Sequence, residues 1–189
     1  MFPRGRGTET SRPHTFPRLI LVTGGARAGK SRFALGLAEK GRFRRRLFVA
    51  TGVPCDGEMA GRIARHRRER NGSWVTVEEP LNLPERLKTH RLSSGTLLLL
   101  DCLPTFVTNH LLANSSPSRI ESRVGDLLKA CRRAGLSAIL VSNEVGLGIV
   151  PDHPLGRRFR DLLGRINQRV AEAADEVYLL VAGIPVRLK

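Results

Sequence analysis

The chain has 189 residues, 41% of them hydrophobic, and a formal net charge of +15. This length and apolar content predict one domain with a sizeable core, and no apolar run approaches the roughly 18 residues of a membrane span. The basic residues are mostly arginines, with few aromatic residues among them, which disfavours a stacking platform for single-stranded nucleic acid. We therefore predict no membrane span and no nucleic-acid partner.

Apolar and amphipathic segments alternate after Arg18, a pattern typical of a parallel α/β sheet. We expect strands at residues 19–23, 47–50, 74–78, 96–100, 138–142 and 176–181. Helices are expected at residues 30–40, 57–70, 84–91, 103–113, 119–134 and 155–174, and loops at 115–118 and 143–154. Residues 183–185 are expected to turn the chain into a short antiparallel strand at 186–188.

Residues 1–17 are rich in Arg, Pro, Gly and Thr and lack the apolar core of a signal peptide. We expect a disordered basic extension there, followed by a single domain at residues 18–189. Three cysteines, Cys55, Cys102 and Cys131, lie far apart and form no C-x-x-C pair. This usage predicts free thiols in the reducing cytoplasm.

The first expected strand leads into G-G-A-R-A-G-K-S at residues 24–31, which fits the phosphate-binding pattern G-x-x-x-x-G-K-[ST]. Glycines let backbone N–H groups wrap around a phosphate, Lys30 supplies a cation, and the Ser31 hydroxyl can ligate Mg²⁺. The alternative is a Gly-rich turn that binds nothing, which the strand and helix on either side disfavour. The motif predicts a P-loop NTPase, RecA-like, with three α/β/α layers, a mostly parallel sheet and an antiparallel C-terminal edge strand.

Other candidate positions follow the expected strands, because ligands of parallel sheets lie at the carboxyl ends of the strands. Asp101 ends a run of four leucines, where an acid can hold the Mg²⁺ of a bound nucleotide, with helix capping as the alternative. Ala50, Thr51 and Gly52 end the second strand. Residues 143–151 follow another strand and are expected to line the site, with turn formation by their glycines as the alternative.

His66 is a candidate nucleophile. Glu58, Arg62 and His66 are spaced i, i+4, i+8 on one stripe of an expected helix. The surrounding arginines oppose protonation of the imidazole, and a neutral imidazole can attack an α-phosphate. The alternative, an exposed histidine on a charged helix, is the one that spacing alone favours.

Five segments resemble a known family. They read V-T-G-G-A-R-A-G-K-S-R-F at residues 22–33, E-M-A-G-R-I-A-R-H-R at 58–67, W-V-T-V-E-E-P at 74–80, S-N-E-V-G-L-G-I-V-P at 142–151 and F-R-D-L-L-G-R-I-N-Q-R-V-A at 159–171. With these segments the chain resembles the bifunctional adenosylcobinamide kinase / adenosylcobinamide-phosphate guanylyltransferase family. The resemblance covers nearly everything after Arg18.

The resemblance implies two reactions of cobalamin biosynthesis. ATP or GTP phosphorylates the amino-propanol hydroxyl of adenosylcobinamide, and GMP from GTP is then transferred onto adenosylcobinamide phosphate, which gives adenosyl-GDP-cobinamide and pyrophosphate. It also implies that His66 carries GMP as a phosphoramidate and that the chain forms a homo-oligomer.

Carried over position by position, the resemblance implies a set of nucleotide contacts. They are the phosphate loop Gly24, Gly25, Ala26, Arg27, Ala28, Gly29, Lys30 and Ser31; Ala50, Thr51 and Gly52; Arg67, Arg68, Glu69 and Arg70; and the acids Glu78 and Asp101. Ser31 and Asp101 are the expected Mg²⁺ ligands. The chain departs from the family pattern at Ala28, where Ser is common, at residues 52–55, at Pro104 and in a shortened region at 114–119.

Two other functions compete with this one. A phosphate-loop kinase of another small metabolite would leave His66 without a role. A GTP-dependent switch or a basic nucleic-acid-binding protein would belong to a different class. A guanine-binding switch typically carries N-K-x-D, which this sequence lacks, and D-C-L-P at residues 101–104 is not D-x-x-G. Nucleic-acid binding would weaken steeply with salt.

Overall fold

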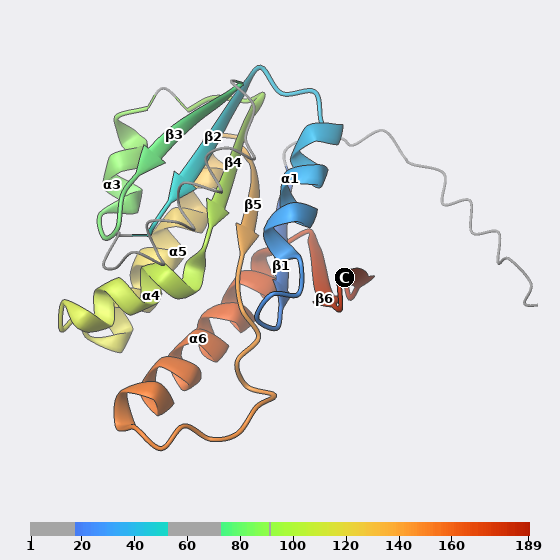
Figure 1. Ribbon diagram of the computed structural model, residues 1–189. Coiled ribbons are helices and arrows are strands. Elements are labelled where there is room, and N and C mark those ends of the chain that lie inside the picture. The colour runs from blue at the N-terminus through green and yellow to red at the C-terminus, as the bar shows by residue number, and fades with distance from the viewer. Residues whose placement is uncertain (1–17, 53–72, 91) are drawn as a thin grey trace, which may run out of the picture.

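The centre of the computed structural model, which describes residues 18–52, 73–90 and 92–189, is a seven-stranded sheet (Figure 1). The strand order is β3-β2-β4-β5-β1-β6-β7, and all neighbouring strands are parallel except the antiparallel pair β6 and β7. A mostly parallel sheet with an antiparallel C-terminal edge strand is therefore confirmed. The strands are β1 (Leu19–Gly24), β2 (Arg45–Ala50), β3 (Trp74–Glu78), β4 (Thr96–Asp101), β5 (Ser137–Val141), β6 (Glu176–Val181) and β7 (Ile184–Arg187).

Helices cover both faces of this sheet, which confirms the three-layer arrangement (Figure 1). Helix α1 lies on one face, and the other described helices lie on the opposite face. Their bounds are α1 (Lys30–Lys40), α3 (Leu83–Lys88), α4 (Leu103–Leu112), α5 (Pro117–Arg133) and α6 (Pro154–Ala173). The helix expected at residues 57–70 lies outside the described residues. Within the described part of the chain, no helix has the length and apolar character needed to cross a bilayer.

The core consists of two apolar layers, one on each face of the sheet. Leu98 and Leu100 of β4 face the layer shared with α3 to α6, whereas Leu97 and Leu99 face the layer shared with α1. All four are at most 1% exposed. A strand that is buried on both faces needs a continuous apolar run rather than an alternating one, which is why residues 97–100 are four leucines.

Four expected boundaries are wrong by two residues or more. Strand β2 begins at Arg45 rather than at residue 47. Helix α5 begins at Pro117, not at residue 119, because Ser116 caps it by accepting a hydrogen bond from the Arg119 N–H at 3.3 Å, with proline in the first turn. Helix α3 ends at Lys88 rather than at residue 91. The C-terminal hairpin turns at Ala182 and Gly183, with φ of 50° and 84°, so β7 begins at Ile184 rather than at residue 186. Two consecutive positive φ angles match the twist of a two-residue hairpin turn.

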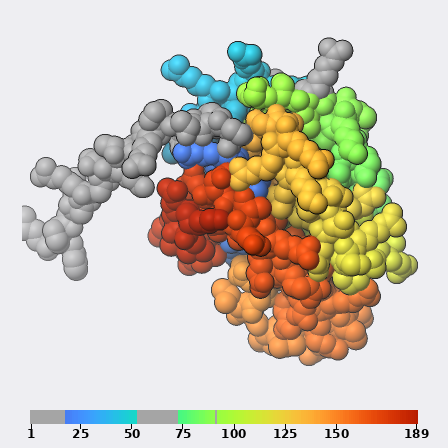
Figure 2. Space-filling view, turned by 180° about the vertical axis from the view of Figure 1, so that it is seen from behind, coloured from blue at the N-terminus to red at the C-terminus, as the bar shows by residue number. Residues whose placement is uncertain are grey.

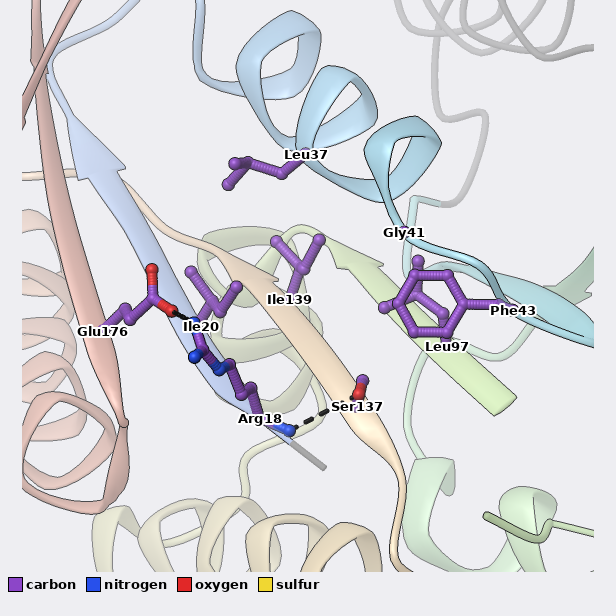
Figure 3. A pocket seen from close by; sticks show the side chains of 9 residues that line it. All are labelled: Arg18, Ile20, Leu37, Gly41, Phe43, Leu97, Ser137, Ile139 and Glu176. Atoms are coloured by element: carbon purple, nitrogen blue, oxygen red, sulfur yellow. Dashed lines mark hydrogen bonds and ion pairs between the residues drawn. The ribbon is translucent and has the colours of Figure 1, made fainter. Parts of the chain in front are cut away.

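A small cavity lies at the amino ends of the strands, beneath the end of α1 (Figure 3). Arg18 and Glu176 form an ion pair at its wall, and the Tyr178 hydroxyl donates to the same carboxylate at 2.7 Å. Leu37, Phe43 and Ile139 form part of its apolar lining. This cavity is at the opposite end of the strands from residues 24–31, so it is separate from the predicted nucleotide site.

Candidate nucleotide-binding site

The phosphate loop follows β1 and leads into α1, as its motif predicts. Gly24 has a φ of 145°, and a Cβ built there would lie 2.4 Å from the carbonyl oxygen of Leu180 on β6. Arg27 and Gly29 also have positive φ, of 57° and 90°. Glycine at position 24 therefore allows β1 and β6 to approach closely, while Gly25, Ala26 and Arg27 are exposed at the mouth of the loop.

Lys30 is held inside the loop at the start of α1. Its ammonium group donates to the carbonyl oxygen of Gly25 at 2.6 Å, and the residue is only 8% exposed. Burial lowers the pKa of Lys30, and the charge of the nearby Asp101 carboxylate opposes that shift. The lysine therefore lies within electrostatic reach of the Asp101 carboxylate, which ends a different strand. Ser31 follows in the first turn of α1 and is half-buried.

Sheet register brings the ends of β2, β3 and β4 together. Ala50 lies opposite Glu78 on one side and opposite Asp101 on the other. Residues on one rung of a parallel sheet point to the same face. Ala50 packs with the α1 layer, so Glu78 and Asp101 also project toward the face that carries the phosphate loop. Gly52 lies two residues beyond Ala50, at the same edge of the sheet.

The segment after β2 is fixed by hydrogen bonds to its neighbours. The hydroxyl of Thr51, which is fully buried, donates to the Cys102 carbonyl at 2.9 Å. The side-chain amide of Asn109 on α4 donates to the carbonyl oxygens of Thr51 at 2.8 Å and of Pro80 at 3.2 Å. Asn109 therefore joins the ends of β2 and β3. Burial raises the pKa of the Cys102 thiol to about 11, so this thiol is neutral.

Two further segments brace the phosphate loop. After β5, the Glu144 N–H donates to the carbonyl of Gly24 at 3.0 Å, and after β6 the Gly183 N–H donates to that of Ala28 at 3.2 Å. Asn167 on α6 accepts from the Ser142 hydroxyl at 2.6 Å and donates to the Asn143 carbonyl at 2.9 Å. The expectation that residues 143–151 lie at the site is consistent with these contacts.

The sequence pattern indicated no role at this site for Asn109 or Asn167, and it placed Gly183 only in the C-terminal turn. Asparagine is a poor helix former, so an asparagine inside a helix is the one signal that could have pointed to Asn109 and Asn167. Nothing local to Gly183 indicates that its N–H reaches residue 28, because that contact depends on the pairing of β6 with β1.

The remaining predicted site residues lie in two groups. His66, Arg67, Arg68, Glu69 and Arg70 lie outside the described residues. Ser31 and Asp101 supply hydroxyl and carboxylate oxygens, the ligand type that Mg²⁺ prefers. Among residues 18–52, 73–90 and 92–189, no group of three or more His, Cys, Asp or Glu side chains could hold a metal. The pair Ser31 and Asp101 nevertheless fits Mg²⁺, because this ion usually takes one or two protein ligands together with phosphate oxygens.

Comparison with known proteins identifies the family. Residues 20–188 match the model of the cobinamide kinase / cobinamide phosphate guanyltransferase family. The bifunctional adenosylcobalamin biosynthesis protein CobU of Salmonella typhimurium is 44% identical over 183 residues, covering 90% of this chain and 99% of that protein. CobP of Pseudomonas aeruginosa, which carries the same description, is 43% identical, covering 89% of this chain and 96% of its own length.

The fold has a wider set of relatives among solved structures. An ATPase from the type III secretion system of pathogenic bacteria superposes with a TM-score of 0.57 at 16% identity. The alignment covers 88% of this chain and 51% of that one, so this chain spans about half the length of the ATPase. This likeness confirms the expected P-loop ATPase fold and nothing beyond it. The family match over residues 20–188 shows that the chain belongs to the cobinamide kinase / cobinamide phosphate guanyltransferase family.

Proposed function

We propose that this chain carries out both reactions that its family description names, with adenosylcobinamide as the first acceptor and adenosylcobinamide phosphate as the second. ATP or GTP donates the phosphoryl group in the first step, and GTP donates GMP in the second. The observation that carries the proposal is the phosphate loop with Lys30 inside it and Asp101 on the same face of the sheet. It supports binding of a nucleoside triphosphate at the carboxyl ends of β1 and β4.

In the kinase step the chain's own groups orient the triphosphate. The exposed loop residues Gly25 to Arg27 present backbone N–H groups, and Lys30 provides a cation for the β- and γ-phosphates. Ser31 and Asp101 would hold Mg²⁺, which offsets phosphate charge when it is bound. The acceptor hydroxyl then attacks the γ-phosphorus, and the bond to the β-phosphate oxygen breaks.

In the transferase step we propose that the neutral imidazole of His66 attacks the α-phosphorus of GTP. The bond from the α-phosphorus to the bridging oxygen breaks and pyrophosphate leaves, so GMP becomes attached to the ring nitrogen. A phosphate oxygen of the acceptor then displaces the histidine, which regenerates the free imidazole. Arg67, Arg68, Glu69, Arg70 and Glu78 are proposed nucleotide contacts in this step, as are Ala50, Thr51 and Gly52.

Labelling with GTP that is radioactive at the α-phosphate, without any acceptor, tests this proposal. We expect label on the protein that is lost in acid and survives alkali, and that His66→Ala abolishes. His153→Asn is the matched control, because asparagine keeps the N-cap that His153 provides to α6. Label that persists in His66→Ala, or a wild-type protein that takes up none, would refute the histidine route.

We also propose that the chain works in the cytoplasm as a homo-oligomer. Support for self-association comes from β7, an edge strand on which Ile184 is 67% exposed and Val186 is 45% exposed. Exposed apolar edge strands are sites of pairing with other chains. Analytical sedimentation of the Val186→Lys variant and of wild type compares their oligomeric states. If the variant assembles like wild type, β7 is not part of the subunit interface.

A further inference from the structure

The segment after β5 stands beside the phosphate loop and is fixed at both of its ends. At its start, the N–H groups of Ser142 and Glu144 donate to the carbonyls of Val22 at 2.9 Å and Gly24 at 3.0 Å. Near its end, the Arg157 guanidinium donates to the carbonyl of Pro151 at 3.0 Å and to that of Asp152 at 2.5 Å. The part between these anchors is therefore presented at a defined place next to β1.

That part carries three apolar side chains that face solvent. Leu147 is 86% exposed, Ile149 is 95% exposed and Val150 is 55% exposed. We call these three residues the apolar loop. In Figure 1 the segment swings out below the carboxyl ends of the strands before it enters α6, and in Figure 2 this region and the start of α6 form the lower margin of the molecule.

Single exposed apolar residues are ordinary, but a cluster beside a functional site marks a binding surface. The neighbouring Val145 packs against the core instead. The chain therefore partly buries Val145 against the core and exposes the next three apolar residues, so the high exposure is confined to the part that projects from the fold.

We propose that the apolar loop binds the corrin ring of the acceptor. This inference rests on the proposed function, in which the reacting hydroxyl or phosphate must reach the phosphate loop while the bulk of the acceptor lies outside it. A corrin ring carries methyl groups on its periphery, which apolar side chains can cover. The hydrogen bond from Glu144 to Gly24 places the start of this segment in contact with the phosphate loop, where the reacting end of the acceptor must enter.

A second copy of this chain is the competing occupant. Stable protein interfaces bury about 800 Å² on each partner and involve roughly 20–30 residues a side. Three side chains on one loop are far fewer than that. They are, however, enough to contact part of one face of a small macrocycle, so the acceptor is the occupant that this surface fits.

The test is equilibrium dialysis and steady-state kinetics with cobinamide, whose visible absorbance reports binding directly. In the variant Leu147→Gln combined with Ile149→Gln, we expect the Kd and the KM for cobinamide to rise by about ten-fold or more, since each lost apolar contact weakens binding several-fold. The KM for the nucleotide and the acceptor-free labelling from GTP should stay at wild-type values.

Leu112→Gln is the matched control, because Leu112 is 67% exposed at the end of α4 and glutamine is a good helix former. It should leave cobinamide binding unchanged.

Wild-type cobinamide affinity in the double variant would overturn the inference while leaving the proposed function standing. A changed sedimentation coefficient in the double variant would also overturn it, because the loop would then be a subunit contact. A wild-type enzyme that neither binds nor phosphorylates cobinamide would overturn both.

Discussion

The side-chain amide of Asn109 donates one hydrogen bond to the carbonyl of Thr51 at 2.8 Å and a second to that of Pro80 at 3.2 Å. Thr51 follows β2 and Pro80 follows β3, so a single residue of α4 fixes the ends of two strands. Because Ala50 and Glu78 end those strands on the same rung, Asn109 sets the spacing of two proposed nucleotide contacts. We infer that it is a positioning residue.

Replacing Asn109 with Ala should weaken nucleotide use more than a loss of folding alone would explain. Two hydrogen bonds disappear, each worth about 1 kcal/mol net, so the urea midpoint should fall with an unchanged m-value. At a temperature where the variant is fully folded, the KM for GTP in the labelling reaction should rise about ten-fold, while the labelled fraction at saturating GTP stays near wild type.

The control for Asn109 is Thr108→Ala, which changes an exposed residue of the same helix. It should leave both the urea midpoint and the KM for GTP in place. If Asn109→Ala loses stability but keeps its KM, the asparagine supports the fold without positioning the site.

Asn167 occupies a corresponding place on α6. It accepts from the buried Ser142 hydroxyl and donates to the Asn143 carbonyl. Asn167→Leu should destabilise the protein by roughly 2–3 kcal/mol, because a buried hydroxyl and a carbonyl lose their partners. Ser142→Ala in the Asn167→Leu background should recover part of that loss, since it removes the unpaired hydroxyl. Urea unfolding of the two single variants and the double variant measures this coupling, and strictly additive losses would contradict it.

The sequence predicts most strands and the phosphate loop because their signals are local. Residues 97–100 form a continuous apolar run that suits a strand buried on both faces, and the spacing of Gly24, Gly29 and Lys30 requires no knowledge of distant residues. The predicted ends of helices and strands are wrong where the local signal in the sequence is weak. Ala182 and Gly183 form the hairpin turn without the Asn-Gly or Asp-Gly pair that marks such turns most clearly.

The strand order and the contacts that brace the site could not be predicted, because they join distant parts of the chain. The Glu144 N–H donates to residue 24 only because β5 pairs with β1, and the Gly183 N–H donates to residue 28 only because β6 pairs with β1. Likewise, Asn109 meets Thr51 across 58 residues of sequence. A residue whose partner is set by topology leaves almost no trace in its local pattern.

Gly24 offers a test of the close approach between β1 and β6. Gly24→Ala would put a Cβ 2.4 Å from the Leu180 carbonyl oxygen at a φ that disfavours side chains, so we expect a loss of roughly 2–4 kcal/mol in the free energy of unfolding. Gly25→Ala is the matched control for stability, because a Cβ at that position meets nothing within 4 Å. Thermal unfolding of both variants gives the comparison, and equal midpoints would show that β6 moves aside at little cost.

The lowered pKa of the Asp175 carboxyl predicts how the free energy of unfolding depends on pH. Its carboxylate accepts from the Leu19 N–H at 2.6 Å and from Arg132 at 2.9 Å, which ties the start of β1 to α5. Desolvation alone would raise the pKa of Asp175, but these hydrogen bonds and the positive charges of Arg132 and Arg18 outweigh it and lower the pKa. A carboxyl whose pKa is lower in the folded state stabilises the protein above its unfolded pKa, and that stabilisation is lost as the pH falls through the folded value.

Asp175→Asn should therefore cost stability at pH 7 and progressively less as the pH falls below about 4, the ordinary range of an aspartate. The cost at pH 7 should be at most about 1 kcal/mol, because the side chain is 39% exposed and solvent screens the pair. Urea unfolding of wild type and variant between pH 3 and 7 measures the difference. Asp161→Asn, at an exposed pair with Arg160, should show a small difference that varies little with pH. A gap between wild type and Asp175→Asn that stays constant over the same range would mean that the carboxylate's charge contributes nothing to holding β1. The loss would then come only from the hydrogen bond that the amide, with its single acceptor oxygen, fails to accept.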